Sequence, residues 1–398
     1  MRVGIIGQGY VGLTVATFAA RTHRVIGFDK SEKLVSQLNQ GISHIEGIKS
    51  SELANLIKEG NYSATNDGSA LNGCDVIVIA VPTPLDEKRK PDLSFVESAC
   101  DVISAHVKSP ALIINESTSF PGTLRDVIKT RIESKSDVDF LYASSPERVD
   151  PGRDDWNQLN TPRLFSGLTQ EATAKTREFY GSFCDELVEV SSPEVAEAAK
   201  LFENSFRQVN IAFVNEFAQI AHALGIPVRE VLDAAATKPY GFMKFTPSAG
   251  VGGHCIPVDP TYLADVASKH GVSAKFIELA NQVNLDMAAY VVDRVKSDCG
   301  SLQGKKVQLI GVSYKPNVAD IRETPAELIR EHLLTSGAVV TWHDPLVQTW
   351  LGESSTALGG GDIAIVVTAH DAVRPADIMA SAPYVFDTTG KVPGAHSL

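Results

Sequence analysis

The segment from Gly250 to Pro260 holds the side chain best suited to covalent chemistry. It reads Gly250-Val251-Gly252-Gly253-His254-Cys255-Ile256-Pro257-Val258-Asp259-Pro260. Glycines let a backbone crowd a ligand, and a cysteine directly after them, between a histidine and an acid, resembles a placed nucleophile. The two prolines indicate a helix that begins soon after Cys255, and a helix N-terminus would favour its thiolate. The alternative is a buried, unreactive thiol beside a structural His254.

A second set of polar side chains lies at helical spacing further upstream. Lys200 and Asn204 are four residues apart, and Arg207 follows three residues later, so the three share one face of a predicted helix. A solvated polar stripe would show the same spacing. Phe202 and Phe206 interleave with these polar residues on a helix that we expect to be mostly enclosed. Polar residues on an enclosed helix favour a functional site over a solvated polar stripe.

The segment Ser145-Pro146-Glu147-Arg148-Val149-Asp150-Pro151-Gly152 follows a predicted strand. Ligands of open α/β sheets gather at the carboxyl ends of strands. Glu147 could act as a base there, and Arg148 could clamp a phosphate or carboxylate. A proline-pinned turn with a surface ion pair is the alternative.

The N-terminus carries a dinucleotide-binding pattern. Gly7-x-Gly9-x-x-Gly12 lies between a predicted strand and a predicted helix, and Asp29 ends the next strand. The glycines permit a tight turn and close approach of a pyrophosphate to the helix N-terminus. Asp29 would bind the ribose hydroxyls of NAD and repel the 2′-phosphate of NADP, although Lys30 weakens that exclusion. A glycine-rich turn without a ligand is the alternative.

Tyr314-Lys315-Pro316 follows a strand at the phosphate-loop position of a second alternating block. The glycine pattern is missing there. Lys315 could hold a nucleotide's phosphates in its place. A Rossmann-like domain that binds nothing and serves only for packing is the alternative.

The order of these elements predicts an α/β protein with two Rossmann-like, doubly wound domains joined by a long central helix and a helical middle domain. We expect a dinucleotide-binding domain over residues 1–192, a helical dimerisation domain with the cysteine loop over 193–300, and a second nucleotide-binding domain over 301–398. Strands are predicted at 2–6, 24–28, 76–80, 111–115, 140–143, 307–311, 339–342, 363–368 and 384–387. Helices are predicted at 194–222, from 228, at 261–298 and at 324–336.

Composition narrows the class of protein. The 398 residues carry a formal net charge of −12, which argues against nucleic-acid or anionic-membrane partners. The five cysteines fit no metal spacing, so we expect reduced thiols, no metal and a cytoplasmic location. No signal peptide or membrane span is predicted.

Seven ordered blocks resemble the UDP-glucose/GDP-mannose dehydrogenase family over nearly the whole chain. They are GQGYVG, VPTPL, EST, SPERVDPG, AAKLFENSFRQVNIAFVNE, GVGGHCIPVDP and YKPNVADIRETP. Histidine before the cysteine, with PERVDPG and ENSFR, resembles the UDP-N-acetylhexosamine branch, whereas UDP-glucose enzymes usually carry a GGSC-type loop. The stretch Thr237–Phe242 is most similar to UDP-N-acetylglucosamine 6-dehydrogenases. The UDP-N-acetylmannosamine enzymes usually have His-Pro-Arg there.

The resemblance implies a four-electron oxidation of the sugar C6 alcohol to a carboxylate by NAD, through a thiohemiacetal and a thioester on Cys255. It implies that Lys200 and Asn204 stabilise the oxyanion, that Glu147 or Asp259 activates water, and that Thr118 belongs to the catalytic site. Residues implied to hold NAD are Gly7, Gly9, Tyr10, Val11, Gly12, Asp29, Thr83, Thr118 and Arg322. Residues implied to hold the UDP-sugar are Arg148, Val149, Lys200, Asn204, Arg207, Gly252, Tyr314 and Lys315. The family's long helix also implies a homodimer or a higher homo-oligomer.

Several alternatives stay open at this point. UDP-GlcNAc is the expected substrate, with UDP-ManNAc or UDP-GalNAc as its alternatives. A UDP-glucose or GDP-mannose 6-dehydrogenase would keep the same machinery. A hydroxy-acid dehydrogenase would not need Cys255, and a non-catalytic nucleotide-sugar sensor would need none of the catalytic side chains.

Overall fold

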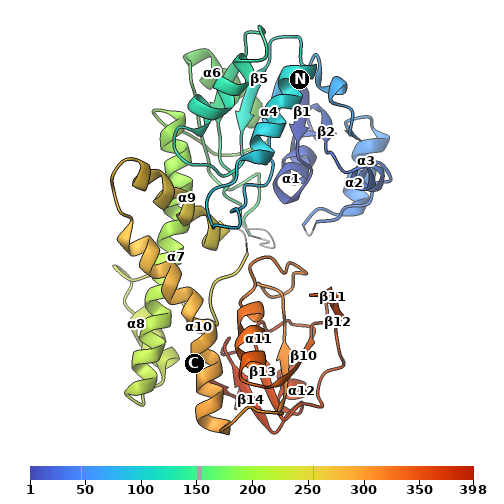
Figure 1. Cartoon of the computed structure of the whole chain (residues 1–398). Helices are drawn as coiled ribbons and strands as arrows, with labels where there is room; N and C mark the ends of the chain where they lie inside the picture. The colour runs from blue at the N-terminus through green and yellow to red at the C-terminus, as the bar shows by residue number, and fades with distance from the viewer. Residues whose placement is uncertain (46, 150–154, 254) are drawn as a thin grey trace. The chain divides into compact units, whose positions relative to one another are not determined.

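A computed structural model describes residues 1–45, 47–149, 155–253 and 255–398. The chain divides into two compact units, of which the first is Met1–Glu203 with Asp265–His270 and the second is Asn204–Ala264 with Gly271–Leu398. Each unit contains a largely parallel sheet flanked by helices (Figure 1). The predicted α/β class, with two such sheets and a helical middle region, is confirmed.

The sheet of the first unit has the strand order β3-β2-β1-β4-β5-β6-β7-β8. The strands from β3 to β6 run parallel in the doubly wound order, and β7 is antiparallel to β6. The sequence patterns did not predict β3, β7 or β8. The eight strands are β1 (Arg2–Ile6), β2 (Arg24–Phe28), β3 (Tyr62–Thr65), β4 (Val76–Ile79), β5 (Leu112–Asn115), β6 (Leu141–Ser144), β7 (Arg163–Gly167) and β8 (Leu187–Glu189).

Both faces of this sheet are buried. Ile5 and Val78 belong to the core under α1 and α6, while the neighbouring Ile77 and Ile79 belong to the core under α4. This alternation follows from the two-residue period of a strand, and it explains why the strands read as continuous apolar runs. The helices are α1 (Tyr10–Ala19), α2 (Glu32–Asn39), α3 (Ser50–Lys58), η1 (Gly68–Leu71), α4 (Ser94–His106), η2 (Thr123–Lys129), α5 (Thr130–Glu133) and α6 (Gln170–Tyr180).

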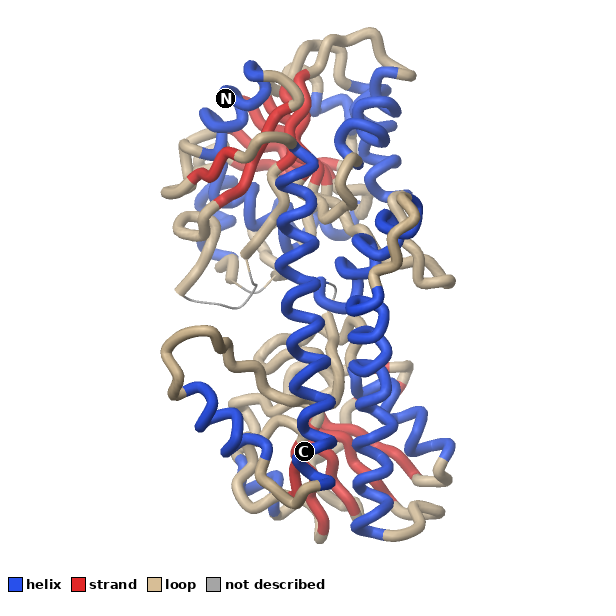
Figure 2. The backbone as a smooth tube through the Cα atoms, turned by 90° about the vertical axis from the view of Figure 1, so that its left-hand side faces the viewer, coloured by secondary structure: helices blue, strands red, loops and turns tan. Residues whose placement is uncertain are grey.

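The helical middle region begins with α7 (Pro193–Ala223), an unbroken helix of 31 residues (Figure 2). Proline is tolerated in the first turn of a helix, and the interior of α7 contains neither proline nor glycine. α8 (Val228–Ala236) follows. The single helix predicted at 261–298 is wrong, because α9 (Cys255–Lys269) and α10 (Lys275–Cys299) are separated by a turn in which Gly271 has a φ of 78°.

Most residues of the long helix are buried or half-buried, as expected, but one side of the helix is exposed in a single chain. Phe202 is 68% exposed and Phe213 is 70% exposed. Ile220 lies seven residues after Phe213 and is 46% exposed. One side of α7 therefore presents large apolar side chains to the surroundings.

The sheet of the second unit has the order β10-β9-β13-β14-β15, with all neighbours parallel. Side chains of α10 and α11 share one core with β9 and β13, and α12 packs on the other face. A separate two-stranded ribbon pairs β11 with β12. These elements are β9 (Lys306–Ile310), α11 (Pro325–Thr335), β10 (Val339–His343), β11 (Thr349–Trp350), β12 (Glu353–Ser354), β13 (Ile363–Val366), α12 (Pro375–Met379), β14 (Tyr384–Asp387) and β15 (His396–Ser397).

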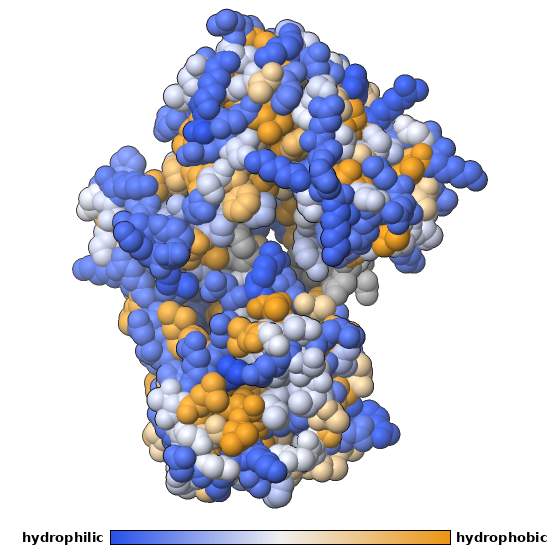
Figure 3. All heavy atoms as spheres, turned by 45° about the vertical axis from the view of Figure 1, so that its right-hand side comes forward, coloured by the Kyte–Doolittle hydropathy of each residue, from blue (hydrophilic) through white to orange (hydrophobic). Residues whose placement is uncertain are grey.

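The surface is mixed in character. On the face shown in Figure 3, hydrophilic residues predominate and hydrophobic ones form small patches. Among the described residues, no helix is long and apolar enough to cross a membrane.

Candidate active site

The glycine loop after β1 is shaped by packing at two positions and left open at a third. Gly7 has a φ of 91°, and a Cβ there would collide with the carbonyl of Ala80. A Cβ on Gly12 would collide with the carbonyl of Gly7, which keeps α1 close to the strand. A Cβ on Gly9 would meet no described atom within 4 Å. The open space before the N-terminus of α1 fits a pyrophosphate, whose charge the helix N–H groups would hold.

Asp29 lies where a ribose would bind. Its Oδ2 accepts a hydrogen bond from the backbone N–H of Gln8 at 3.0 Å, and its Oδ1 accepts one from the N–H of Ser31 at 2.9 Å. A carboxylate has about four acceptor positions, so Asp29 keeps capacity for ribose hydroxyls. The ammonium group of Lys30 donates to the hydroxyl of Ser98, so it is held by the protein.

Two further expected NAD contacts follow neighbouring strands. Thr83 comes after β4 and is buried, and Thr118 comes after β5 and is half-buried. Ser117 joins the two loops, since its Oγ accepts from the N–H of Val81 at 2.8 Å and donates to the carbonyl of Val81 at 2.9 Å. The sequence patterns did not single out Ser117.

Glu147 is fixed by four donors. Its Oε1 accepts from the backbone N–H groups of Arg148 and Val149, both at 2.6 Å. Its Oε2 accepts from the Gln158 amide and from Nη2 of Arg163, the latter at 3.2 Å. Burial alone would raise the pKa of Glu147, but the charge of Arg163 and these hydrogen bonds hold the pKa below its usual value. Glu147 is therefore ionised at neutral pH.

Arg163 is shared between two buried carboxylates. It contacts Glu116 at 3.1 Å as well as Glu147, and its guanidinium lies 4.3 Å from the ring centroid of Tyr180. Burial raises the pKa of Glu116 to about 7, although the charge of Arg163 opposes that rise. Tyr180 donates its hydroxyl to Glu116. Arg163 lies on β7, where the sequence pattern predicts no strand, so no local signal pointed to this residue.

Lys200 and Arg148 both belong to the first unit. Burial raises the pKa of Glu147, and the charge of Lys200 opposes that rise together with the stronger effects of Arg163, Val149 and Gln158. Lys200 itself is half-buried. Arg148 donates to the carbonyl of Pro162 at 2.7 Å and forms an ion pair with Glu203 at 2.7 Å. Arg148 is thus held by protein acceptors, and a substrate phosphate would have to share its guanidinium.

In the second unit, Cys255 is the first residue of α9 and is exposed. The helix begins at Cys255 itself, earlier than the predicted start after this residue, and gives the thiol a helix N-terminus, which favours negative charge. One turn later, the buried Asp259 accepts a hydrogen bond from Nδ2 of Asn204 at 2.5 Å. Arg207 lies three residues beyond Asn204 on α7 and is exposed. His254 and residues 150–154 lie outside the described residues.

The glycines before Cys255 pack on the segment that carries Lys315. A Cβ on Gly253 would lie 2.7 Å from Cε2 of Tyr314, and a Cβ on Gly252 would lie 2.6 Å from Cβ of Tyr314. The N–H of Gly253 donates to the carbonyl of Arg322 at 2.9 Å. The pKa of Arg322 is raised, mainly by its hydrogen bonds to Asp320, and Cys255 adds to that rise. The second unit therefore brings Gly252, Tyr314 and Arg322 together beside Cys255.

Comparison with known proteins identifies the chain. Three profiles of the UDP-glucose/GDP-mannose dehydrogenase family match it in order: the NAD binding domain over residues 1–184, the central domain over 194–286 and the UDP binding domain over 308–392. The chain belongs to this family. It is an NAD-dependent dehydrogenase of nucleotide sugars, so the predicted enzyme class and the predicted cofactor are confirmed.

Relatives cover nearly the full length of the chain. A UDP-N-acetyl-D-mannosamine dehydrogenase of Methanococcus maripaludis is 34% identical over 384 residues, which cover 94% of this chain and 87% of the relative. A UDP-N-acetyl-D-glucosamine 6-dehydrogenase of Pseudomonas aeruginosa is 35% identical over 87% of this chain and 83% of its own length. The structure of a UDP-D-ManNAc dehydrogenase from Pyrococcus horikoshii superposes with a TM-score of 0.89 at 30% identity, covering 100% of this chain and 98% of that one.

Proposed function

We propose that this family member oxidises the C6 alcohol of a UDP-N-acetylhexosamine to the carboxylate, through a thioester on Cys255. The observation that carries the proposal is the exposed thiol at the N-terminus of α9, one turn from the Asp259–Asn204 pair. UDP-GlcNAc is the first candidate because the Thr237–Phe242 stretch resembles enzymes for that sugar. UDP-ManNAc is the second, since relatives with that name align over most of the chain.

The chemistry requires a nucleophile between two oxidations. The first oxidation turns the C6 alcohol into an aldehyde, to which the thiolate of Cys255 adds as a thiohemiacetal. Loss of the remaining C6 hydrogen as hydride leaves a thioester, and water releases the acid with the thiolate as leaving group. When bound, NAD accepts the hydride in each oxidation. One alcohol, two NAD⁺ and one water thus give a carboxylate, two NADH and three protons.

We assign the catalytic roles to polar side chains of α7, α9 and the loops after β5 and β6. Lys200 stabilises the oxyanion and relays protons, and Asn204 donates a second hydrogen bond. Asp259 takes one N–H of the Asn204 amide and so orients the other. Glu147, which is ionised at neutral pH, and Asp259 are the two candidates for activating water. Thr118 completes the catalytic set.

The binding roles follow from the loops that carry the residues. NAD is held by Gly7, Gly9, Tyr10, Val11, Gly12, Asp29, Thr83, Thr118 and Arg322. The UDP-sugar is held by Arg148, Val149, Lys200, Asn204, Arg207, Gly252, Tyr314 and Lys315. We propose three domains, over residues 1–192, 193–300 and 301–398. We also propose that the enzyme is cytoplasmic, because reduced thiols persist in that compartment.

We also propose that the enzyme is a homodimer built on α7. The apolar side of α7 continues into a groove of about 480 Å³ lined by aromatic residues of α7 and of the segment after α8, including Phe213, Phe242 and Phe245. A second copy would cover this surface, which a monomer would leave as a large apolar patch. Phe213→Glu should dissociate the dimer in analytical ultracentrifugation, whereas the control Phe95→Glu, at an exposed phenylalanine of the first unit, should not.

The proposed reaction is tested by counting NADH against a panel of UDP-sugars. UDP-GlcNAc, UDP-ManNAc, UDP-GalNAc and UDP-glucose are each supplied in limiting amount with excess NAD. The proposal expects two NADH per N-acetylhexosamine and the largest kcat/KM for one of the three. One NADH per sugar would contradict the thioester route, and preferred oxidation of UDP-glucose would contradict the substrate class. No NADH with any sugar would favour the nucleotide-sugar sensor.

A further inference from the structure

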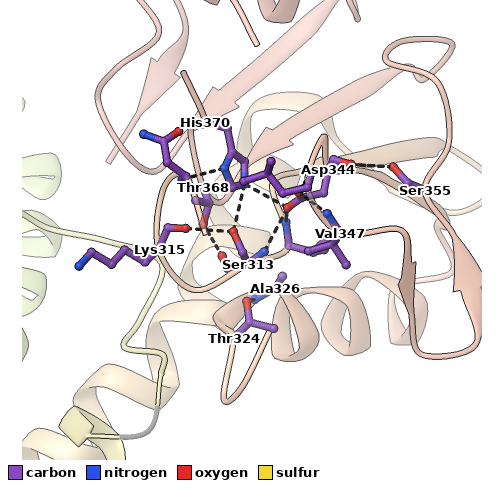
Figure 4. Close-up of polar contacts among 12 residues, drawn as sticks. Ser313, Lys315, Thr324, Ala326, Asp344, Val347, Ser355, Thr368 and His370 are labelled. Atoms are coloured by element: carbon purple, nitrogen blue, oxygen red, sulfur yellow. Dashed lines mark hydrogen bonds and ion pairs between the residues drawn. The ribbon is translucent and has the colours of Figure 1, made fainter. Parts of the chain in front are cut away.

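The segment Ser313–Asn317, which carries Lys315, follows β9 at the place where the first unit has its glycine loop. Figure 4 shows this segment held by side chains from the loops after β10 and β13, while the side chain of Lys315 points away from them. Thr368 donates to the carbonyl of Ser313 at 2.6 Å, and Ser313 Oγ donates to the carbonyl of Lys315 at 3.1 Å. Gly311, with a φ of 75°, makes the same close approach after β9 that Gly7 makes after β1. Beyond Gly311 the glycine pattern ends, and side-chain hydrogen bonds hold the Ser313–Asn317 segment instead.

Asp344 occupies the position after β10 that Asp29 occupies after β2. Both acids accept backbone N–H groups from the loop after the neighbouring strand, and Asp344 accepts from Val312 at 2.8 Å and Ser313 at 3.3 Å. Asp29 is half-buried and keeps room for a ligand, whereas Asp344 is 3% exposed and contacts Nε2 of His370 at 3.1 Å. In the second unit the acid therefore faces a protein side chain.

His370 is buried and uses both ring nitrogens. Its Nδ1 lies 2.9 Å from the backbone nitrogen of Asn317, which can only donate, so Nδ1 carries the lone pair. The proton is therefore on Nε2, which faces Asp344 and the hydroxyl of Ser313 at 3.0 Å. The neutral imidazole thus contacts both ends of the Ser313–Asn317 segment.

The backbone conformation of Asn317 explains why the Ser313–Asn317 segment benefits from the hydrogen bond to His370. Asn317 has a φ of 64°, a left-handed conformation that asparagine adopts more readily than most non-glycine residues but still at some cost in free energy, which its hydrogen bonds offset. Its side chain exchanges two hydrogen bonds with Asp371, at 2.8 Å and 3.0 Å. The loop after β13 therefore fixes Asn317 through both its backbone and its side chain.

We propose that His370 is a positioning residue for the UDP-sugar: it holds the Ser313–Asn317 segment so that Lys315 meets the diphosphate and Tyr314 stays packed on Gly253. The proposal rests on the proposed use of Lys315 for the diphosphate. His370 acts through Asn317 and touches no substrate itself.

The test uses two substitutions that each keep one half of the imidazole's hydrogen bonding. His370→Asn keeps an acceptor near the place of Nδ1, and His370→Gln keeps a donor near the place of Nε2. His370→Leu keeps neither, and His332→Leu on the exposed side of α11 is the control. The Kd for UDP is measured by calorimetry, KM and kcat are measured with the preferred UDP-sugar, and Tm is measured for each variant.

We expect His370→Leu and His370→Gln to weaken UDP binding about tenfold, the effect of losing one buried hydrogen bond. His370→Asn should stay within about threefold of the wild type, and the control should be unchanged. KM should follow the Kd, with kcat changed much less. The proposal would be overturned if His370→Asn and His370→Gln weakened UDP binding equally. It would also be overturned if the Kd for UDP changed only in proportion to the loss in Tm.

The same measurements separate this proposal from the proposed function. If the wild type binds UDP and the variants show the expected order, but no UDP-sugar yields NADH, the positioning role stands and the proposed reaction fails. If UDP-sugars are oxidised with two NADH and all variants bind UDP like the wild type, the reaction stands and His370 has no positioning role.

Discussion

Nδ2 of Asn204 lies 2.5 Å from Oδ2 of Asp259, which joins α7 to the helix that begins at Cys255. Both side chains are buried, so the amide cannot turn to water without losing this bond. We expect Asn204→Ala to lower kcat on the order of 100-fold, the usual effect of removing one oxyanion donor. Asp259→Ala should reproduce most of that loss, and the double variant should be little worse than either single one. Additive losses, measured by single-turnover kinetics, would show that the two residues act separately.

Substitutions at Cys255 should separate the two oxidations. Cys255→Ser can still add to the aldehyde, but the resulting ester is a poorer acyl donor than a thioester, so a covalent adduct should accumulate and be visible by mass spectrometry. Cys255→Ala should keep some first oxidation and lose the second. Cys299→Ser, at a thiol outside the proposed site, is the matched control. Two NADH per sugar from the alanine variant would remove Cys255 from the mechanism.

Lys200→Ala should act on kcat more than on KM. The ammonium is expected to stabilise charge that develops mainly in the transition state, so kcat should fall roughly 100-fold or more. Lys296→Ala, on the surface of α10, should leave both constants unchanged. A variant of Lys200 with normal kcat and raised KM would show that this residue only binds the substrate.

Asp29 should decide between NAD and NADP. A carboxylate that already accepts two backbone N–H groups cannot move away from a 2′-phosphate, so we expect kcat/KM for NAD to exceed that for NADP by at least about tenfold. Asp29→Asn should lower the ratio of kcat/KM for NAD to kcat/KM for NADP, mainly by raising kcat/KM for NADP. Equal kcat/KM for the two cofactors in the wild type would reject this role. Thermal unfolding of the variant checks that the loop contacts to Gln8 and Ser31 survive.

The buried Glu116 should make stability depend on pH. Its pKa is raised from 4.5 to about 7, so its contribution to stability is fully present below pH 4.5 and is lost as the pH rises through 7. Glu116→Gln, which imitates the protonated form, should remove that loss, worth up to about 3 kcal/mol. The measurement is the difference in unfolding free energy between variant and wild type from pH 5 to 8, with the exposed Glu178→Gln as control. A difference that stays flat with pH contradicts the raised pKa.

The sequence by itself determined the local chemistry of this protein. The glycine spacing and Asp29 specified the first βαβ unit, because the steric limit at Gly12 is set by the carbonyl of Gly7, five residues earlier in the same turn. Apolar runs located most strands, and the absence of breakers located α7. The cysteine loop and its helix start were also predictable, because proline and glycine act on their own backbone.

Only the tertiary structure decided the contacts between distant segments. Arg163 meets Glu116 and Glu147 because β7 returns beside β6, and no local pattern records that pairing. His370 reaches Asn317 across 53 residues through the neighbouring strands β9 and β13. The packing also decides that Phe202 is exposed while Asn204, two residues later on the same helix, is buried. The contact partners of a side chain and its burial depend on how distant segments pack, so a pattern of neighbouring residues cannot predict them.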